Sequence, residues 1–226
     1  MPGAARANET EALSHPCRRR FLACLAPPLS SGESGFAPLF SGRDLEGWIL
    51  KGGRGRGYIV EDGAIVCPAD GGGNLFTVKQ YADFILRLEW RLWDGGNNGV
   101  GIRAPLAGDV AYSGMEIQIL DDEAEVYQRM PIKPTQYTGS VYDVFPAKPG
   151  HARRNGIWNQ YEITARGRRV TVVLNSVMVC DARLDTITDP AVLKRHPGLL
   201  NKAGHIGLLG HGTRVEFRHL RIKELA

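Results

Sequence analysis

Hydrophobic and polar residues alternate with a period of two along several short segments after residue 35. The clearest is 84–92, where Leu86, Leu88 and Trp90 share one parity while Arg87 and Glu89 share the other. Because successive side chains of a strand point to opposite faces, this pattern predicts an antiparallel strand with one face in a core and one in solvent. Trp90 is therefore predicted to be a core residue.

Turn residues separate these segments and predict two tight hairpins. Glu61-Asp62-Gly63 lies between apolar runs at 58–60 and 64–67, and Asn175-Ser176 lies between runs at 170–174 and 177–180. Asn, Asp and Gly accept the positive φ angles that two-residue hairpin turns require. Further strands are predicted at 100–103, 115–120, 160–165, 205–209 and 215–222, with one short helix at 189–196. Many short strands with turns between them are typical of an all-β sandwich or jelly roll.

The segment 115–120 has the most informative polar face. Glu116 and Gln118 alternate with Met115, Ile117 and Ile119, and the paired acids Asp121 and Asp122 follow directly. A period of two places Glu116 and Gln118 on one side of the predicted strand. The acceptor-rich side chains on this face favour the floor of a binding site over an ordinary solvent face.

Composition excludes several classes of protein. The chain has 226 residues, 43% hydrophobic and 23% charged, with a formal net charge of +4. No basic stripe interleaved with aromatic residues is present, so nucleic-acid binding is not expected. No apolar run is long enough to span a membrane. The four cysteines lie far apart without zinc-ligand spacing, and Cys67 and Cys180 are predicted to be buried thiols.

Residues 1–35 have no periodicity and are interpreted separately. Arg18, Arg19, Phe21 and Leu22 are similar to the core of a twin-arginine export signal, but the apolar stretch after them is short and is interrupted by two prolines. We expect either a degenerate export signal, with a secreted or periplasmic protein, or a disordered tail, with a cytoplasmic one.

Motifs spread from residue 36 to the C-terminus resemble the 3-keto-disaccharide hydrolase domain family. They are Phe40-Ser-Gly-Arg-Asp-Leu-Glu-Gly-Trp48, Val60-Glu-Asp-Gly63, the 83–90 strand, Gly96-Asn-Asn-Gly-Val-Gly-Ile-Arg103, the acidic strand, Gly139-Ser-Val-Tyr-Asp143, Trp158-Asn159, Gly204-His-Ile-Gly-Leu208, His211-Gly212 and the 217–225 strand. The resemblance implies a single domain over 36–226 with a concanavalin A-like jelly roll of two antiparallel sheets. It also implies cleavage of glycosides whose C3 hydroxyl has been oxidised to a ketone, with an oligosaccharide or glycoside as the substrate.

Three positions depart from patterns of this family or of similar glycosidases. Asn98 stands where the family commonly has Ser, and Leu209-Gly210 stands where a Gln often precedes the His-Gly pair. The acidic strand is similar to the Glu-x-Asp-x-x-Glu motif of laminarinase-type glycosidases, but Gln118 replaces the middle acid. A standard double-displacement glycosidase mechanism is therefore not expected.

Five residues are candidates for catalysis. Glu116, together with Asp121 or Asp122, is the predicted acid/base group, because cleavage at a sugar acetal needs a proton donor and a proton acceptor. A ketone at C3 acidifies the proton on C2, so a base can start an elimination that water addition completes. Arg103 is the predicted cation for the enolate or a partner of Glu116. His211 is the predicted titrating group or metal ligand.

A second set of residues is predicted to contact the sugar. Gln118, Asn97, Tyr142 and Asp143 can exchange hydrogen bonds with hydroxyl groups, although a turn explains Asn97 better and a strand-end Asp such as Asp143 is often just a turn acceptor. Trp93 precedes Asp94-Gly-Gly96 and is the predicted exposed platform for a sugar ring. His205 is predicted to be packed or hydrogen-bonded in the fold.

Two other functions remain open from the sequence. The same sandwich with aromatic and amide residues serves carbohydrate-binding, lectin-like modules that have no catalytic activity. Alternatively Asp121, Asp122 and Glu123 can hold a divalent ion such as calcium, because carboxylate oxygens are its preferred ligands. The oligomeric state is not predicted.

Overall fold

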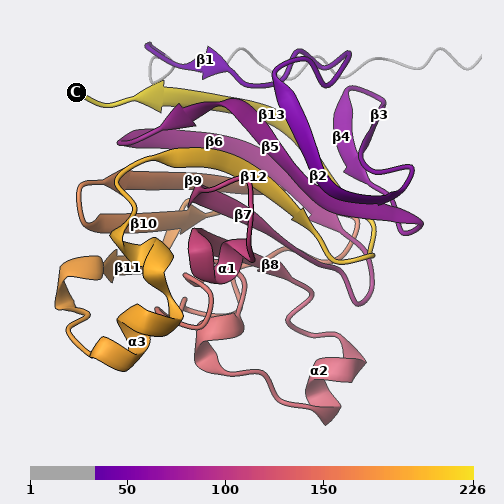
Figure 1. The fold of residues 1–226 in the computed structure, drawn as a ribbon. Coiled ribbons are helices and arrows are strands. Elements are labelled where there is room, and N and C mark those ends of the chain that lie inside the picture. Colours follow the sequence, from indigo (N-terminus) through magenta and orange to yellow (C-terminus); the bar gives the residue numbers. More distant parts are fainter. Residues whose placement is uncertain (1–33) are drawn as a thin grey trace, which may run out of the picture. The chain divides into compact units, whose positions relative to one another are not determined.

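Two antiparallel sheets pack face to face in the computed structural model, which describes residues 34–226 (Figure 1). One sheet has eight strands in the order β11 (Val177–Arg183), β10 (Arg169–Leu174), β9 (Asn159–Arg166), β6 (Phe84–Leu92), β13 (Val215–Glu224), β4 (Ala64–Cys67) and β3 (Ile59–Glu61), with β1 (Ala37–Pro38) paired to β13. The other has five strands in the order β2 (Trp48–Gly55), β5 (Gly71–Tyr81), β12 (Gly204–Gly210), β7 (Asn97–Ala104) and β8 (Met115–Leu120). The predicted all-β sandwich of two antiparallel sheets is confirmed.

The core lies between the sheets and follows the predicted alternation. Residues of β6 alternate between buried and half-buried along its whole length, and Trp90 is 1% exposed. Its inner side chains meet those of β8, where Ile117 and Ile119 are fully buried. The thiols of Cys67 and Cys180 are free and buried, as predicted. The period of two in the sequence therefore reports which face of each strand enters the core.

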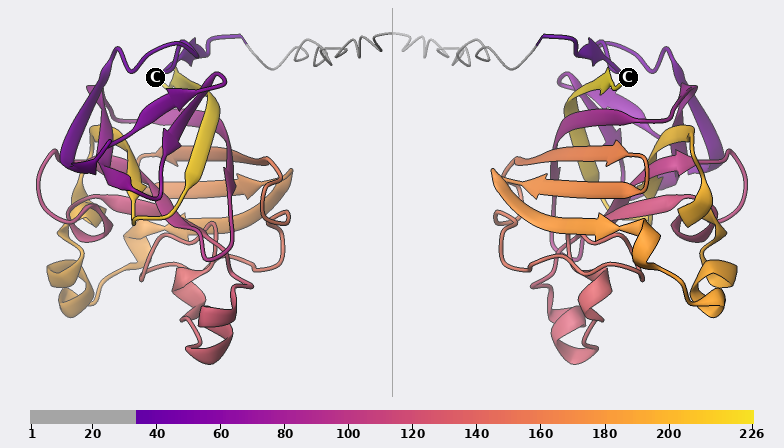
Figure 2. Two further views of the ribbon diagram at one scale, coloured as in Figure 1. Left: turned by 90° about the vertical axis from the view of Figure 1, so that its right-hand side faces the viewer. Right: turned by 90° about the vertical axis from the view of Figure 1, so that its left-hand side faces the viewer.

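Both predicted hairpins are present. Asp62 and Gly63 have φ angles of 48° and 75° between β3 and β4, and Asn175 and Ser176 have φ angles of 49° and 72° between β10 and β11. Two successive positive φ angles make the turn whose twist matches that of the paired strands. Figure 2 shows β9, β10 and β11, drawn in orange, side by side in one layer.

The helices are short and lie in the connections. They are α1 (Val110–Ser113), α2 (Glu125–Arg129) and α3 (Pro190–Arg195), with 3-10 turns at Pro134–Gln136, Leu184–Thr186 and Pro197–Leu200. The helix predicted at 189–196 is α3, which Asp189 caps by accepting a hydrogen bond from the Ala191 N–H. The sequence pattern did not predict α1 and α2, because segments this short carry no helical period.

Helix α1 lies against the face of the five-stranded sheet that is turned away from the eight-stranded sheet, which we call the open face. A Cβ atom at Gly101 would lie 2.8 Å from Cγ1 of Val110, so α1 sits on bare backbone of β7. Phe76 and Leu209 contact Val110 in a small apolar cluster on this face. Helix α1 therefore covers one part of the open face.

The predicted export signal lies outside the described residues, so it stays a prediction. Within residues 34–226, no helix is long and apolar enough to cross a membrane.

Candidate functional site

The polar residues of β8 point to the open face. Register pairs Glu116 with Gly101 and Gln118 with Gly99 of β7, and directly opposed residues of an antiparallel pair share a face. The inner neighbours Ile117 and Ile119 enter the core. Glu116 and Gln118 are only 4% and 3% exposed, so the polar side chains predicted to line the floor of a site are almost fully buried.

A glycine makes room for the carboxylate of Glu116. A Cβ atom at Gly99 would lie 2.0 Å from Oε1 of Glu116 and 2.6 Å from its Cγ, so the side chain lies across the backbone of Gly99. Oε1 is buried and, among the described residues, accepts no hydrogen bond. The nearest cationic group is His211, whose Nε2 lies 3.8 Å from Oε1. An unsatisfied buried acceptor is costly, so this atom is the group on the face with the strongest need for a hydrogen-bond donor or a proton.

His211 stands at the rim, directly after β12. Its side chain is 49% exposed, whereas that of Glu116 is 5% exposed. The nearby carboxylate of Glu116 raises the pKa of His211, and the negative charge of Asp109 adds to this effect, while burial and Arg54 oppose it. The imidazole therefore keeps its proton to a higher pH than a free histidine.

Two amide side chains lie beside the carboxylate on the same face. Nε2 of Gln118 donates to Oδ1 of Asn97 over 3.2 Å. Thr213 holds the backbone of Asn97, because its hydroxyl accepts from the Asn97 N–H and donates to the Asn97 carbonyl. Asn97 therefore belongs to β7, not to a turn, and the structure brings it together with Gln118.

Tyr142 extends the row of Glu116 beyond the edge of the sheet. Its N–H donates to the Glu116 carbonyl over 2.9 Å, and an isolated bridge joins Val141 to Ile117. The Tyr142 hydroxyl accepts from Nε2 of Gln136 over 3.1 Å. Tyr142 is half-buried and lies beside Glu116 on the open face.

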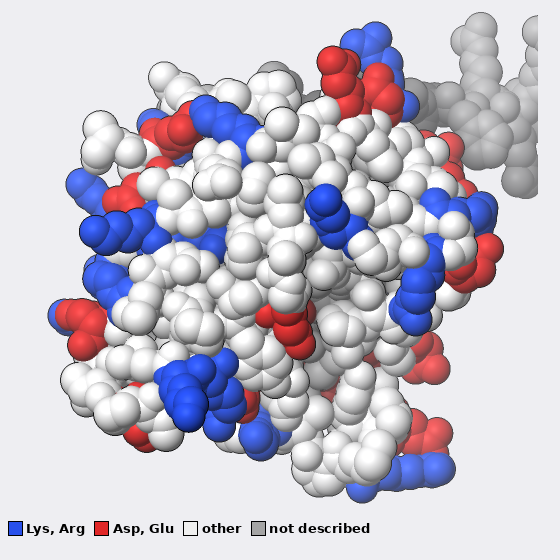
Figure 3. All heavy atoms as spheres, viewed as in Figure 1, with Lys and Arg blue, Asp and Glu red and all other residues white. Residues whose placement is uncertain are grey.

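The space-filling view of this face is hollowed near its centre (Figure 3). Acidic atoms lie at the margin of the hollow on the side of α1, and basic side chains lie on the side of β2. The charged neighbours of His211 are Asp109, the N-cap residue of α1, and Arg54 of β2. Neither residue was predicted from the sequence, although Asp109 precedes a short helix as N-cap residues do.

The prediction for Arg103 is wrong. Its guanidinium donates to the carbonyls of Ala82 and Gly167 and forms an ion pair with Asp83 over 2.8 Å. Arg103 has a φ angle of 48°, which turns the chain at the end of β7. With its donors bound and 1% exposure, Arg103 joins three segments of the fold and has no contact with Glu116.

Asp121 and Asp122 lie too far along the chain to act with Glu116. A strand rises about 3.3 Å per residue, which puts their Cα atoms roughly 16 and 20 Å from that of Glu116. The carboxyl pairs of glycosidases are separated by about 5 to 10 Å. Asp121 accepts from the Gly95 N–H and from Nδ2 of Asn155, and Asp122 accepts from the N–H and hydroxyl of Thr138. The two acids hold loops together, which corrects their predicted catalytic role.

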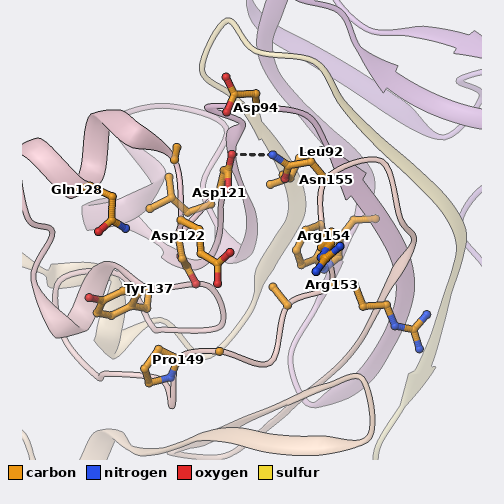
Figure 4. Close-up of a pocket in the computed structure, with 16 residues that line it drawn as sticks. Leu92, Asp94, Asp121, Asp122, Gln128, Tyr137, Pro149, Arg153, Arg154 and Asn155 are labelled. Atoms are coloured by element: carbon orange, nitrogen blue, oxygen red, sulfur yellow. Dashed lines mark hydrogen bonds between the residues drawn. The ribbon is translucent and has the colours of Figure 1, made fainter.

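Both acids line a separate cavity of about 950 Å³ at the end of β8 (Figure 4). Figure 4 shows Asp121 bonded to Asn155, with the arginines 153 and 154 across the cavity. Burial raises the pKa of Asp122 to about 6, against two hydrogen bonds from Thr138 that lower it. Within residues 34–226, no three His, Cys, Asp or Glu side chains are grouped as a metal site requires. The calcium site stays a prediction without support from this geometry.

Two predicted sugar contacts are occupied by protein groups. The guanidinium groups of Arg91 and Arg214 lie 5.3 and 5.4 Å from the ring centre of Trp93, on the outer side of the eight-stranded sheet. Trp93 is therefore not an open platform beside Glu116. Asp143 forms ion pairs with Lys133 and Arg195 and lies 3.3 Å from Nε2 of His196, and these contacts anchor neighbouring loops. His205 is buried and bonded to the Thr77 carbonyl, as predicted.

Comparison with known proteins gives one family and several relatives. The family model described as 3-keto-alpha-glucoside-1,2-lyase-like domain matches residues 35–223. A 3-keto-disaccharide hydrolase of Bacteroides thetaiotaomicron is 26% identical over 233 residues, which cover 84% of this chain and 79% of that protein. The resemblance inferred from the sequence motifs is confirmed.

Solved structures share the fold. The crystal structure of a "Putative glycosyl hydrolase" from Parabacteroides distasonis superposes with a TM-score of 0.73 and 27% identity, covering 84% of this chain and 99% of that chain. A carbohydrate-binding module from Bacillus subtilis superposes with a TM-score of 0.52 and 14% identity, covering 79% of this chain and 96% of the module. The second likeness concerns the jelly-roll fold alone.

Proposed function

Because the chain belongs to the 3-keto-alpha-glucoside-1,2-lyase-like domain family, we propose that it cleaves 3-keto-glycosides on the open face of its five-stranded sheet. The observation that carries this proposal is the pair formed by Glu116 and His211. A buried carboxylate oxygen that accepts no hydrogen bond from residues 34–226 lies 3.8 Å from an imidazole at the rim of a hollow. Such a pair can accept one proton and deliver another.

Glu116 is the proposed base. The ketone at C3 acidifies the C2 proton, so Oε1 of Glu116 takes that proton and the C2–H electrons form an enolate with the C3 oxygen. When the ketone re-forms, the electrons make a double bond between C1 and C2 and the C1–O bond breaks. A base without competing hydrogen bonds accepts a proton most readily, and Oε1 accepts none from the described residues.

His211 is the proposed acid. Its raised pKa keeps the imidazole protonated, so Nε2 gives its proton to the leaving glycosidic oxygen. Water then adds at C1 and a proton returns to C2, so the net reaction is hydrolysis. Turnover is expected to fall as the pH rises above about 6.5 through the raised pKa of His211, since the acid loses its proton there.

The amides of Asn97 and Gln118 are the proposed donors to the enolate oxygen. Nε2 of Gln118 donates a hydrogen bond to Oδ1 of Asn97. This bond fixes the orientation of the Asn97 amide and therefore the direction of its Nδ2 donor. Preorganised donors at a developing negative charge lower the barrier without further rearrangement. They take the place that the sequence analysis assigned to Arg103.

The test uses a 3-keto-disaccharide and its unoxidised parent in deuterated water, with sugar release followed by mass spectrometry. Release from the keto substrate alone, with deuterium at C2 of the keto product, supports elimination followed by hydration. Release from both compounds contradicts the need for a ketone. Binding of the sugars without release from either would favour the carbohydrate-binding module.

A variant identifies the base in the same assay. Glu116→Gln keeps the shape of the side chain and removes its basicity, so deuterium exchange and sugar release should both be lost. The matched control is Glu162→Gln on β9, whose carboxylate pairs with Arg87 on the other sheet. Turnover by Glu116→Gln equal to that of the control would remove Glu116 from the mechanism.

A further inference from the structure

An irregularity in β2 turns two cations toward the open face. Lys51 pairs with Asn74 of β5, and Arg54 pairs with Gly72. From one pair to the next the chain advances three residues in β2 but only two in β5. This extra residue is a β-bulge, and Gly52, with a φ angle of 59°, gives the backbone the conformation it needs. Asn74 lies on the open face, because its neighbour Leu75 enters the core. The bulge therefore places Lys51 and Arg54 on the same side of the sheet.

The guanidinium of Arg54 lies close to His211. A Cβ atom at Gly212 would lie 3.6 Å from Nη2 of Arg54, and one at Gly72 would lie 3.7 Å from it. Gly212 follows His211 in the chain, so Arg54 lies on the opposite side of His211 from Glu116 along the sheet. The absence of side chains at both glycines leaves the guanidinium against bare backbone.

Neither cation has a partner in the described part of the chain. The side chains of Lys51 and Arg54 form no hydrogen bond and no ion pair within residues 34–226 and are exposed. By contrast Arg56, two residues on, makes two hydrogen bonds to Asp70 over 3.0 and 3.2 Å. Arg54 therefore keeps all its donors available beside the proposed proton donor.

The spacing of the strands sets the distance to the base. Register runs across the open face from Lys51 through Asn74 and Leu209 to Gly99, above which Glu116 lies. At about 4.8 Å per strand, Lys51 is about 14 Å from Gly99. A keto sugar over Glu116 would therefore have its leaving sugar next to the cations of β2.

We propose that Arg54 and Lys51 form a subsite for a carboxylate on the leaving sugar. The preferred substrates are then 3-keto-glycosides whose leaving sugar is a uronic acid. The inference rests on the proposed function. The planar fork of a guanidinium matches a carboxylate, and Lys51 adds a second positive charge. Asp109 on the flank of α1 repels an anion, which directs the carboxylate to the flank of β2.

The test compares three substrates that differ in the position of one carboxylate. They are a 3-keto-glucoside with glucose as leaving sugar, the same compound with glucuronic acid as leaving sugar, and one with the carboxylate on the keto sugar. We expect kcat/KM to be about fivefold higher for the leaving glucuronic acid than for glucose. Arg54→Gln should reduce this ratio to about one, and Lys51→Gln should reduce it by a smaller factor, since an ammonium lacks the bidentate fork.

The matched control is Arg166→Gln, which removes an exposed arginine at the end of β9. It should leave the ratio as in the wild type, whereas 0.5 M salt should lower it through screening. A ratio unchanged by Arg54→Gln would overturn the subsite. A preference for the carboxylate on the keto sugar would overturn its placement on the leaving side.

Binding separates this inference from the proposed function. If the wild type cleaves none of the three substrates, the proposed function fails. Calorimetry with the unoxidised disaccharides, which needs no turnover, then decides the subsite alone. Tighter binding of the glucuronic acid compound by the wild type and not by Arg54→Gln supports the subsite, and equal binding of both compounds overturns it.

Discussion

The buried acidic side chains on the outer faces of the two sheets differ in their hydrogen-bond and ion-pair partners. On the eight-stranded sheet both carboxylate oxygens of Glu216 are bound, one by Arg91 and the other by Arg214, at 2.6 to 2.8 Å. On the five-stranded sheet Oε1 of Glu116 is just as deeply buried, but within residues 34–226 it accepts no hydrogen bond and the nearest cationic group is His211, at 3.8 Å. A satisfied acid holds a fold together, whereas an unsatisfied one remains available to a substrate.

The same contrast extends along both faces. Arginines also bind the other acids on the outer side of β6 and β9, namely Glu89 through Arg218 and Glu162 through Arg87. The arginine beside the proposed catalytic pair, Arg54, is left without a partner in the part of the chain that the structure describes. The proposed function therefore uses the face on which acids and bases are not all paired with each other.

Glu116→Gln should have the largest effect and tests the contrast directly. Removal of a general base lowers the rate by about 10² to 10⁴, and we expect a loss of about 10³ in kcat on a 3-keto-disaccharide. The melting temperature should not fall, because the variant removes a buried charge whose Oε1 accepts no hydrogen bond from residues 34–226. A large loss of stability instead would make Glu116 a structural acid like Glu216.

Gly99→Ala should have the next largest effect. The added Cβ would meet Oε1 of Glu116 at 2.0 Å and must push the carboxylate aside, and a displacement of about 1 Å can cost about 10² in rate. The pKa of His211, followed by NMR, should fall toward its ordinary value as Glu116 moves away. In a Glu116→Gln background the glycine change should cost nothing further, because its effect passes through Glu116. Additive losses would place the effect of Gly99 elsewhere.

Much of this site follows from the alternation of residues. The period of two put Glu116 and Gln118 on one face, and pairing of neighbouring strands brings Asn97 and Tyr142 to the same face. Local patterns are sufficient there because strand geometry fixes side-chain direction. Asp62 and Gly63 similarly determine their hairpin through positive φ angles.

The remaining assignments depended on contacts between distant segments. Arg103 looked free in the sequence, but Asp83 and the carbonyl of Gly167 bind it in the fold. Asp121 follows the acidic strand directly, yet the rise of the strand carries it away from Glu116. Arg54 reaches the site only because a bulge in β2 adds one residue, and a glycine pair signals that irregularity only weakly.

Glu216→Gln tests the structural side of the contrast. The side chain at position 216 is nearly buried, and an amide there cannot neutralise the charges of Arg91 and Arg214. We therefore expect the free energy of unfolding to fall by about 2 kcal/mol. Urea unfolding measures this loss. Turnover should stay within twofold of the wild type, since Glu216 lies on the other sheet. A large fall in activity at unchanged stability would contradict the division between the two faces.

Asp122→Asn should have the smallest effect and sharpens the contrast within one sheet. Burial raises the pKa of Asp122 to about 6, so its folded-state pKa lies above its unfolded value of 3.8. The resulting contribution to stability is fully present below pH 3.8 and is lost as the pH rises through about 6. At pH 8 the carboxylate is therefore charged and partly buried at a cost.

The asparagine removes that cost and keeps an oxygen for the two hydrogen bonds from Thr138. We expect the free energy of unfolding of Asp122→Asn to be about 1 kcal/mol higher than that of the wild type at pH 8. Near pH 3.5 the two free energies of unfolding should be nearly equal. Urea titrations at both pH values measure this. Turnover should be retained, because Asp122 lies roughly 20 Å along the chain from Glu116. A loss of turnover close to that of Glu116→Gln would return Asp122 to the catalytic site. Distance from Glu116 along β8 would then not distinguish an acid that holds a loop from one that takes part in the reaction.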